Sequence, residues 1–173
     1  RQHVFCAALV MMAVLTAGCS RKARPGEYRD ARHDFGLIPP AGWEKQEGTG
    51  MPAVMFLSPT QGPNDAFQEN VNVVVEELPS RLTVDEYASA AIRTLELATT
   101  DFQAASETDV DLNGQPAKRL VSTYKLGVGS VKSVVYMIVA GKKAYVITCT
   151  ARPDTYDNYE QVFDTCCTSF MVD

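Results

Sequence analysis

The stretch SVKSVVYMIVAGKKAYVITCTA, residues Ser130–Ala151, decides the fold. It holds two apolar runs of strand length, and Gly141 and Lys142 lie between them. Glycine readily adopts the backbone angles that a tight turn requires. The stretch therefore predicts two neighbouring strands joined by a short turn. Strands that are joined so closely pair in antiparallel fashion.

Five more strands are predicted before this pair. They cover Phe35–Leu37, Ala53–Pro59, Val71–Leu78 and two segments within Glu107–Leu126. The centre of Val71–Leu78 is apolar on both faces, which predicts an inner strand. Within Glu107–Leu126, Asn113 and Gly114 form a pair that suits the positive φ angles of a hairpin turn.

Two helices complete the pattern. The first is predicted over Thr83–Leu97, because Thr83 and Glu86 have the spacing of a capping box and Leu82 can contact Tyr87 as a hydrophobic staple. Its apolar face, which we expect to pack on the sheet, consists of Val84, Tyr87, Ala88, Ala91, Ile92 and Leu95. We expect Asp154 to cap the second helix. The apolar face of that helix consists of Tyr156, Tyr159, Val162, Phe163 and Cys166.

The order of these elements shows no internal repeat and no repeated crossover unit. It predicts an α+β fold, with a largely antiparallel β-sheet flanked by helices. The chain has 173 residues, of which 46% are hydrophobic and 21% are charged, so it can form one globular domain with a core of ordinary size. We place this domain at residues 34–173.

The first 18 residues have the pattern of a secretory signal peptide. Arg1 and His3 precede the apolar run Val4–Leu15, which is shorter than the roughly 18 residues needed to cross a bilayer. Because the sequence does not begin with methionine, we expect part of the leader to precede Arg1.

The residues LTAGC that follow resemble the lipobox of bacterial lipoproteins. In this comparison Ala17 and Gly18 precede the cleavage site, and Thr16 occupies the place where the family prefers leucine. The resemblance implies that Cys19 becomes the new amino terminus and carries fatty chains such as palmitate. Several acyl chains would anchor the protein in a membrane permanently. The alternative is ordinary signal cleavage near the same small residues, with Cys19 left as a free thiol or disulfide partner.

Residues 19–33 are predicted to be a flexible, lipidated tether. Between Ser20 and His33 five cations face two acids, a net charge of +3, whereas from Asp34 onward ten cations face nineteen acids, a net charge of −9. The basic segment would be attracted to anionic lipid, and the acidic body would be repelled by lipid and by nucleic acid. We therefore expect no nucleic-acid partner and a body that stands about 20 Å from its anchor. A soluble linker with incidental charges is the alternative.

The order of several short segments resembles the PsbP-like family, which includes extrinsic photosystem proteins and bacterial DcrB-type envelope lipoproteins. The segments are GW, SP, NVNVVVEEL, TVDEYA, NGQPAKRL, GKKAYVITCTA and the ending SF, and they span residues 34–172. The resemblance implies an α/β/α sandwich, and members that act mainly as assembly, stabilising or adaptor proteins. It implies no catalytic residues. Cys166 and Cys167, just before the SF ending, depart from the pattern.

Residue types give little support for catalysis, cofactor binding or metal binding. After signal removal His33 is the only histidine, and it lies beside the tether, so a nucleophile has no obvious base. Glu107, Asp109 and Asp111 share one face of a predicted strand and could offer oxygen ligands to calcium. The simpler interpretation is a solvated face, with Thr108, Val110 and Leu112 pointing inward. We therefore predict that the protein is not an enzyme and has no metal site or cofactor.

Three cysteines give the clearest chemical signal in the domain. Cys149 shares a strand face with Tyr145 and Ile147, and Cys166 lies on the apolar face of the last helix. In an oxidising compartment Cys149 can pair with Cys166 or Cys167, and the bridge would close a loop of about 17 residues. Unpaired buried thiols are an equally open interpretation, and redox or metal chemistry is a third.

Taken together, the sequence predicts an extracytoplasmic envelope lipoprotein, periplasmic if the host has an outer membrane. We expect an adaptor or assembly factor that binds membrane lipid through acylated Cys19 and an envelope protein through its sheet face or loops. The alternative function is a carrier of a small ligand or metal ion, with its site near Trp43 and the loop Ser58–Asn70.

Overall fold

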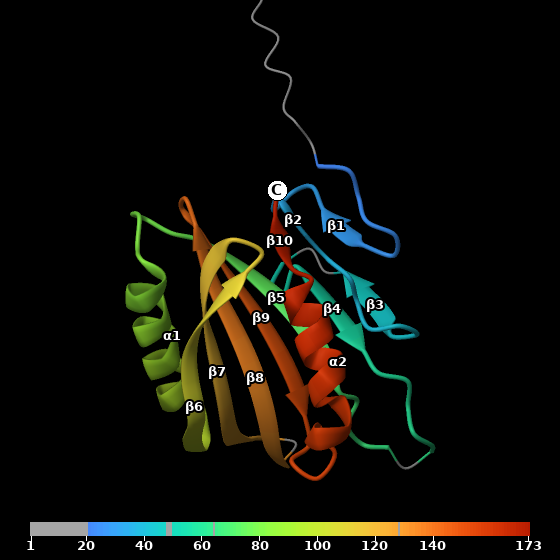
Figure 1. Ribbon diagram of the computed structural model, residues 1–173. Coiled ribbons are helices and arrows are strands. Elements are labelled where there is room, and N and C mark those ends of the chain that lie inside the picture. The colour runs from blue at the N-terminus through green and yellow to red at the C-terminus, as the bar shows by residue number, and fades with distance from the viewer. Residues whose placement is uncertain (1–20, 48–49, 64, 128) are drawn as a thin grey trace, which may run out of the picture.

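The computed structural model describes residues 21–47, 50–63, 65–127 and 129–173. Its main strands are β3 (Glu44–Glu47), β4 (Val54–Leu57), β5 (Asn70–Glu77), β6 (Thr100–Leu112), β7 (Gln115–Leu126), β8 (Gly129–Ala140) and β9 (Lys143–Ala151). They form one sheet in the order β3-β4-β5-β9-β8-β7-β6 (Figure 1). Every neighbouring pair is antiparallel, which confirms the predicted sheet.

The hairpin of β8 and β9 lies inside the sheet, with β7 on one side and β5 on the other. Gly141, with φ of +65°, makes the predicted turn. Tyr145 and Ile147 of β9 belong to the core on one face of the sheet, and Ala144 belongs to the core on the opposite face. Because successive side chains of a strand alternate between faces, an apolar strand that is buried on both faces requires cover on both.

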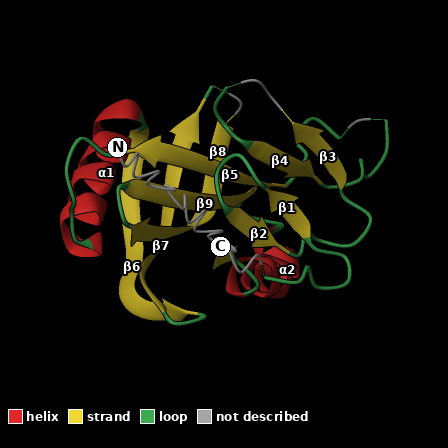
Figure 2. Ribbon diagram, turned by 90° about the horizontal axis from the view of Figure 1, so that it is seen from above, coloured by secondary structure: helices red, strands yellow, loops and turns green. Residues whose placement is uncertain are grey.

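The two faces of the sheet are covered differently (Figures 1 and 2). On one face α1 (Val84–Ala98) packs alone, mainly against β7 and β8. On the other face α2 (Tyr156–Thr168) packs beside a small sheet of β1 (Tyr28–Asp30), β2 (Phe35–Leu37) and β10 (Met171–Val172). The larger core cluster lies on the α2 face and the smaller cluster on the α1 face. This arrangement confirms the α+β fold with helices on both sides of the sheet.

The predicted start of one helix is confirmed and that of the other is wrong. Thr83 caps α1, since its hydroxyl accepts a hydrogen bond from the Glu86 N–H at 3.2 Å, and the Glu86 carboxylate accepts one from the Thr83 N–H at 2.8 Å. The cap position of α2 is Thr155, without a side-chain cap, whereas Asp154 pairs with Arg152 at 3.4 Å.

The amino-terminal boundary of the domain also differs from the prediction. The tether was placed at residues 19–33, but the segment that begins at Arg21 folds onto the domain, and its strand β1 pairs with β2. The physical reason is a set of long-range ion pairs that the local charge pattern does not reveal. Strand β6 likewise begins at Thr100, ahead of the predicted Glu107.

The contribution of the Thr83 cap to the stability of α1 can be tested by substitution. Thr83→Ala removes the hydroxyl that satisfies the Glu86 N–H, so we expect the free energy of unfolding to fall by about 1 kcal/mol in urea titrations. Thr94→Ala is the matched control in the same helix, because the Thr94 hydroxyl only donates to the Ala90 carbonyl and alanine has the higher helix propensity. An equal loss in both variants would contradict the cap.

Candidate functional site

The structure offers three places with functional potential. The first is a groove between α1 and the sheet. The second is the thiol cluster, which consists of Cys149, Cys166 and Cys167. The third, which we call the clamp, consists of Arg21, Arg24, Glu27, Arg29 and Asp173.

The groove has a volume of about 520 Å³. Its floor comes from the sheet and its wall from α1. The apolar residues of the floor are Val74, Leu120, Val135, Met137 and Val146, and those of the wall are Ala90, Ala91, Ile92, Leu95 and Ala98. The volume and the apolar lining fall within the range of ligand sites in proteins.

The groove exists because only two residues of the apolar face of α1 are fully buried. Tyr87 and Ala88 are buried, whereas Ala91, Ile92 and Leu95 remain partly exposed. The alanines of the wall are too small to fill the space above the floor. The predicted packing of this helix face on the sheet is therefore confirmed, but its partly exposed residues leave apolar surface for another molecule.

A few polar groups line the groove. They are Glu76, Thr94 and Thr148, together with the hydroxyl-bearing Tyr87 and Tyr124. Burial raises the pKa of Tyr87 well above its usual value, and the nearby Glu76 raises that pKa further. The Tyr87 hydroxyl consequently stays protonated and can donate a hydrogen bond. The groove therefore suits an apolar ligand or side chain with a polar end.

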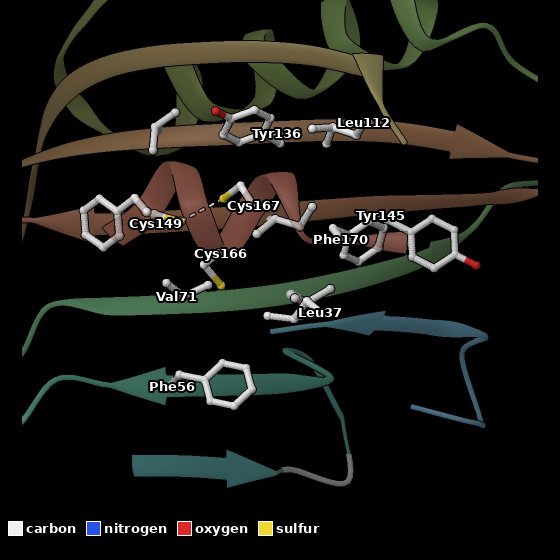
Figure 3. Packing of buried hydrophobic residues seen from close by; sticks show 14 of the residues in the cluster. Leu37, Phe56, Val71, Leu112, Tyr136, Tyr145, Cys149, Cys166, Cys167 and Phe170 are labelled. Carbon is white, nitrogen blue, oxygen red and sulfur yellow. Dashed lines mark hydrogen bonds between the residues drawn. The ribbon is translucent and has the colours of Figure 1, made fainter. Parts of the chain in front are cut away.

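The thiol cluster lies in the core between β9 and α2. The Sγ atoms of Cys149 and Cys167 are 3.2 Å apart, and both residues are fully buried. Figure 3 shows these two side chains pointing toward each other, while Cys166 points toward Val71. Of the two candidate partners, Cys167 is therefore the one in contact with Cys149. All three cysteines are free thiols. Burial raises the pKa of Cys149, with a further contribution from Cys167, so the thiol is protonated and weakly nucleophilic.

The clamp is centred on the carboxylate of Glu27, whose side chain is 0% exposed. Oε1 accepts hydrogen bonds from Arg21 and Arg24, both at 2.8 Å. Oε2 accepts one from Arg21 at 3.0 Å and one from the Arg24 backbone N–H at 2.8 Å. Hydrogen bonds from the Arg21 guanidinium, and then those from Arg24, lower the pKa of Glu27 from 4.5 to about 2.

Two further contacts fasten the clamp to the domain. Asp173 accepts hydrogen bonds from Arg21 at 3.2 Å and from Arg29 at 2.6 Å. Gly36 of β2 lies so close to the clamp that a Cβ there would be 2.7 Å from Glu27 Oε1. In the sequence Glu27 is one of two acids in a basic segment. Its role depends on contacts with the distant carboxyl end, and no local pattern indicates them.

The remaining predicted polar residues do not form a site. Asp109 pairs with Lys118, and Asp111 accepts a hydrogen bond from the Gly114 N–H at 2.8 Å, while Glu107 is exposed. Leu112 is buried as expected, but Thr108 is exposed because β6 is an edge strand. Among the residues that the structure describes, no group of three or more His, Cys, Asp or Glu residues has a metal-binding arrangement.

His33 and Trp43 have structural contacts. The His33 Nδ1 lies 2.7 Å from Asp30 Oδ2, and the His33 carbonyl accepts a hydrogen bond from the Tyr145 hydroxyl at 3.0 Å. Trp43 contacts Tyr159 and Phe163 of α2 edge-on. Trp43 therefore lies on the α2 face of the sheet, and the groove lies on the opposite face.

The predicted processing and lipidation residues, Ala17, Gly18 and Cys19, lie outside the described residues. Within the described part of the chain, no helix has the length and apolarity to span a membrane.

Comparisons with known proteins give one family match and several structural matches. A family model described as DcrB matches residues 39–169, and no curated protein matches the sequence. Cyanobacterial PsbP (CyanoP) from Synechocystis sp. PCC 6803 is 18% identical, with a TM-score of 0.64 over 91% of this chain and 99% of that chain. LpqN, described as involved in cell envelope biogenesis of Mycobacterium tuberculosis, is 14% identical, with a TM-score of 0.66 over 80% of this chain and 82% of that chain.

A third similar structure is the Ran-binding protein Mog1p of Saccharomyces cerevisiae. It is 15% identical, with a TM-score of 0.61 over 84% of this chain and 94% of that chain. Identities this low establish a common fold and nothing about function. They confirm the PsbP-like fold that the sequence predicted.

The thiol geometry predicts which cysteines pair in an oxidising compartment. With oxidised glutathione as electron acceptor during refolding, Cys149 and Cys167 should each lose a proton and form one disulfide that stabilises the fold by about 3 kcal/mol. A digest mapped by mass spectrometry without reduction should show the peptide of Cys149 linked to that of Cys167. Cys166→Ala should keep this stabilisation and Cys167→Ala should lose it. A link to Cys166, or three free thiols, would contradict the prediction.

The clamp predicts a dependence of stability on pH. Because the pKa of Glu27 is lowered on folding, its contribution is complete above pH 4.5 and is lost as the pH falls toward 2. At neutral pH, Glu27→Gln should lower the free energy of unfolding by about 1–3 kcal/mol, and the difference from the unaltered protein should shrink as the pH falls from 4.5 to 2. Urea titrations of both proteins between pH 2 and pH 7 measure this difference in the free energy of unfolding.

Glu44→Gln is the control for the clamp, since Glu44 is an exposed acid of β3 outside the clamp. It should change stability little at any pH. A deficit for Glu27→Gln that stays constant between pH 4.5 and pH 2 would refute the lowered pKa of Glu27.

Proposed function

This chain belongs to the DcrB family, and from that membership we propose that it is a lipid-anchored adaptor or assembly factor for proteins of the cell envelope. Its domain binds and is not catalytic. Anchoring is through fatty chains on Cys19, on the extracytoplasmic side of the membrane. The single observation that carries the binding role is the exposed apolar groove between α1 and the sheet.

Three observations support an envelope location and an anchor. The LTAGC motif follows an apolar leader, as in bacterial lipoproteins. The DcrB match covers most of the domain. The similarly folded LpqN is described as involved in cell envelope biogenesis.

The surroundings of the cysteine thiols and of His33 support a non-catalytic role. Cys149 and Cys167 are fully buried, and burial raises the pKa of Cys149, so this thiol is neither accessible nor ionised. His33 is held by Asp30 in the turn between β1 and β2. Nucleophilic catalysis needs an accessible, activated nucleophile beside a base.

The shape and the lining of the groove support the binding of a partner protein. An open apolar cleft with polar groups at its margin is typical of surfaces that receive apolar side chains of a partner. Leu97 of α1, which is 86% exposed, adds apolar surface at the end of the helix. We propose that an apolar segment of an envelope protein binds here.

A second function is favoured by the volume of the groove. About 520 Å³ is within the range of small-molecule sites, so the protein could instead carry a small apolar ligand. In that case the groove holds the ligand and no protein occupies it. The same experiment separates the two functions.

Photocrosslinking in native membranes tests the adaptor. A benzophenone amino acid at Thr94, which lines the groove, should give a protein adduct, and one at Arg93, outside the groove lining, should not. Ala90→Glu places a charge in the groove and should abolish the adduct, since burying an unpaired carboxylate is strongly unfavourable. Ser89→Glu, on an exposed neighbouring residue outside the lining, is the matched control and should keep the adduct.

Other outcomes of this experiment distinguish the adaptor from the carrier. An adduct that survives Ala90→Glu would exclude the groove as the binding surface. A lipid or small-molecule adduct at Thr94, without any protein, would favour the carrier. Cys19→Ser should abolish the protein adduct by releasing the domain from the membrane.

A further inference from the structure

We propose that the clamp holds the domain on an anionic lipid surface in one orientation. The end of the domain that faces the lipid carries the β1–β2 turn (residues 31–34), the β8–β9 turn (residues 141–142) and Asp173. This inference rests on the proposed function for the attachment at Cys19, and it shortens the connection between the anchor and the domain to the residues before Arg21.

The first step is that the chain is attached to the domain from Arg21 onward, with no flexible segment between Arg21 and β1. Arg21 contacts both Glu27 and Asp173, and Arg24 donates a hydrogen bond to the Ser169 carbonyl at the end of α2. Beyond this point β1 pairs with β2 in the small sheet. The chain is therefore fixed to the body of the domain from Arg21 onward.

The second step is the short distance to the anchor. Only Ser20 separates Cys19 from Arg21, and two residue steps span at most about 7 Å. Fatty chains on Cys19 consequently enter the bilayer next to the clamp. The end of the domain around the clamp must then lie at the lipid surface.

The third step identifies the parts of the domain at this end. The Asp34 carbonyl accepts a hydrogen bond from the Asp173 N–H at 2.9 Å, and Lys143 pairs with Asp34 at 2.8 Å. The Lys142 carbonyl accepts one from the Leu78 N–H at 2.7 Å. Figure 1 shows the chain end marked C, the start of β2 and the turn after β8 together at one end of the molecule.

The charges at the two ends favour this orientation. At the clamp end Lys22, Arg32, Arg81 and Lys142 are exposed, and none has an ion pair within the described residues. Asp34 and Asp173 at this end are each paired with a cation. Glu77, Glu86 and Asp111 are exposed acids there without an ion pair within the described residues, so the four unpaired cations outnumber them.

At the opposite end, Asp154 and Asp157 lie in and after the turn that leads into α2, and they pair with Arg152 and Lys132 at 3.4 Å and 3.5 Å. Glu160 is exposed nearby and has no ion pair within the described residues. Figure 1 places this turn at the far end of the sheet from the chain end marked C. An anionic surface attracts the unpaired cations of the clamp end and repels the unpaired Glu160 of the opposite end, so the charges favour the same orientation.

The orientation has a consequence for the groove. In Figure 1 α1 begins near the clamp end and runs away from it. On the lipid surface the helix would therefore stand upright, and the groove would be reached from the side. A neighbouring membrane-attached protein can approach from that side.

Hydrogen exchange on vesicles tests the orientation. The chain from Cys19 is coupled through that sulfur to a maleimide phospholipid in vesicles of phosphatidylcholine and phosphatidylglycerol, and exchange is measured by mass spectrometry. Amides of residues 31–34 and 141–142 should exchange several-fold more slowly than in the uncoupled protein. Amides of residues 152–155 should be unchanged. Similar protection at both ends, or protection at neither, would overturn the proposal.

Two variants test the role of the clamp in this protection. Glu27→Gln should remove the protection while the protein stays attached, and Glu44→Gln should keep it. If Glu27→Gln does not fold, Asp173→Asn serves instead, because it removes the carboxylate that pairs with Arg29 and with one side of Arg21 and leaves the buried Glu27 unaltered. Full protection in a folded clamp variant would show that the clamp does not orient the domain.

The anchor is tested separately, so that the two proposals fail in different ways. Mass spectrometry of the protein from its native membranes should find fatty chains on Cys19. A bare Cys19 would refute the lipid anchor in the proposed function, whereas the coupled protein would still decide whether the clamp orients the domain.

Discussion

The hairpin of β8 and β9 is apolar on both faces, and the rest of the structure follows from the need to cover both. Val134 and Ile147 belong to the core on the α2 face, while Val135 and Ala144 belong to the core on the α1 face. A two-faced strand pair cannot remain at an edge or face water, because burial of apolar surface is the main favourable term in folding. The chain supplies a helix for each face, and the two faces are closed to different extents.

On the α2 face the cover is complete, and both ends of the described chain contribute to it. Phe35 of β2 stacks on Phe170 and contacts Tyr145 of β9 edge-on. The clamp secures the same junction from outside. The clamp therefore contributes to the stability of this face, and it lies next to the proposed anchor in the sequence.

On the α1 face a single helix covers the sheet and leaves the groove open. Small residues of α1 keep the helix wall thin, while the floor of the groove is formed by buried strand residues such as Leu120 and Met137. The closed α2 face and the open, apolar α1 face therefore have different roles. The closed side holds the domain together, and in our proposal it also lies at the lipid surface, whereas the open side is the proposed binding surface.

The sequence alone determined the parts of the fold that depend on neighbouring residues. Both hairpin turns, the capping box of α1, the antiparallel sheet and the burial of Cys149 and Cys166 were predicted correctly, because alternation, turn chemistry and capping act over a few residues. The PsbP-like resemblance rested on the same local patterns.

Only the tertiary structure decided the clamp, the groove and the contact between the thiols of Cys149 and Cys167. Arg21 and Asp173 are separated by 152 positions in the chain, and Arg21 looks like any other cation of a basic linker until the fold brings the two together. The groove depends on how far α1 lies from the sheet along its length, which helical periodicity does not specify. Cys166 and Cys167 are adjacent in the sequence, and only the rotation of α2 in the core selects the one that faces Cys149. Each of these features is a relation between distant segments, so it arises from packing and not from local sequence.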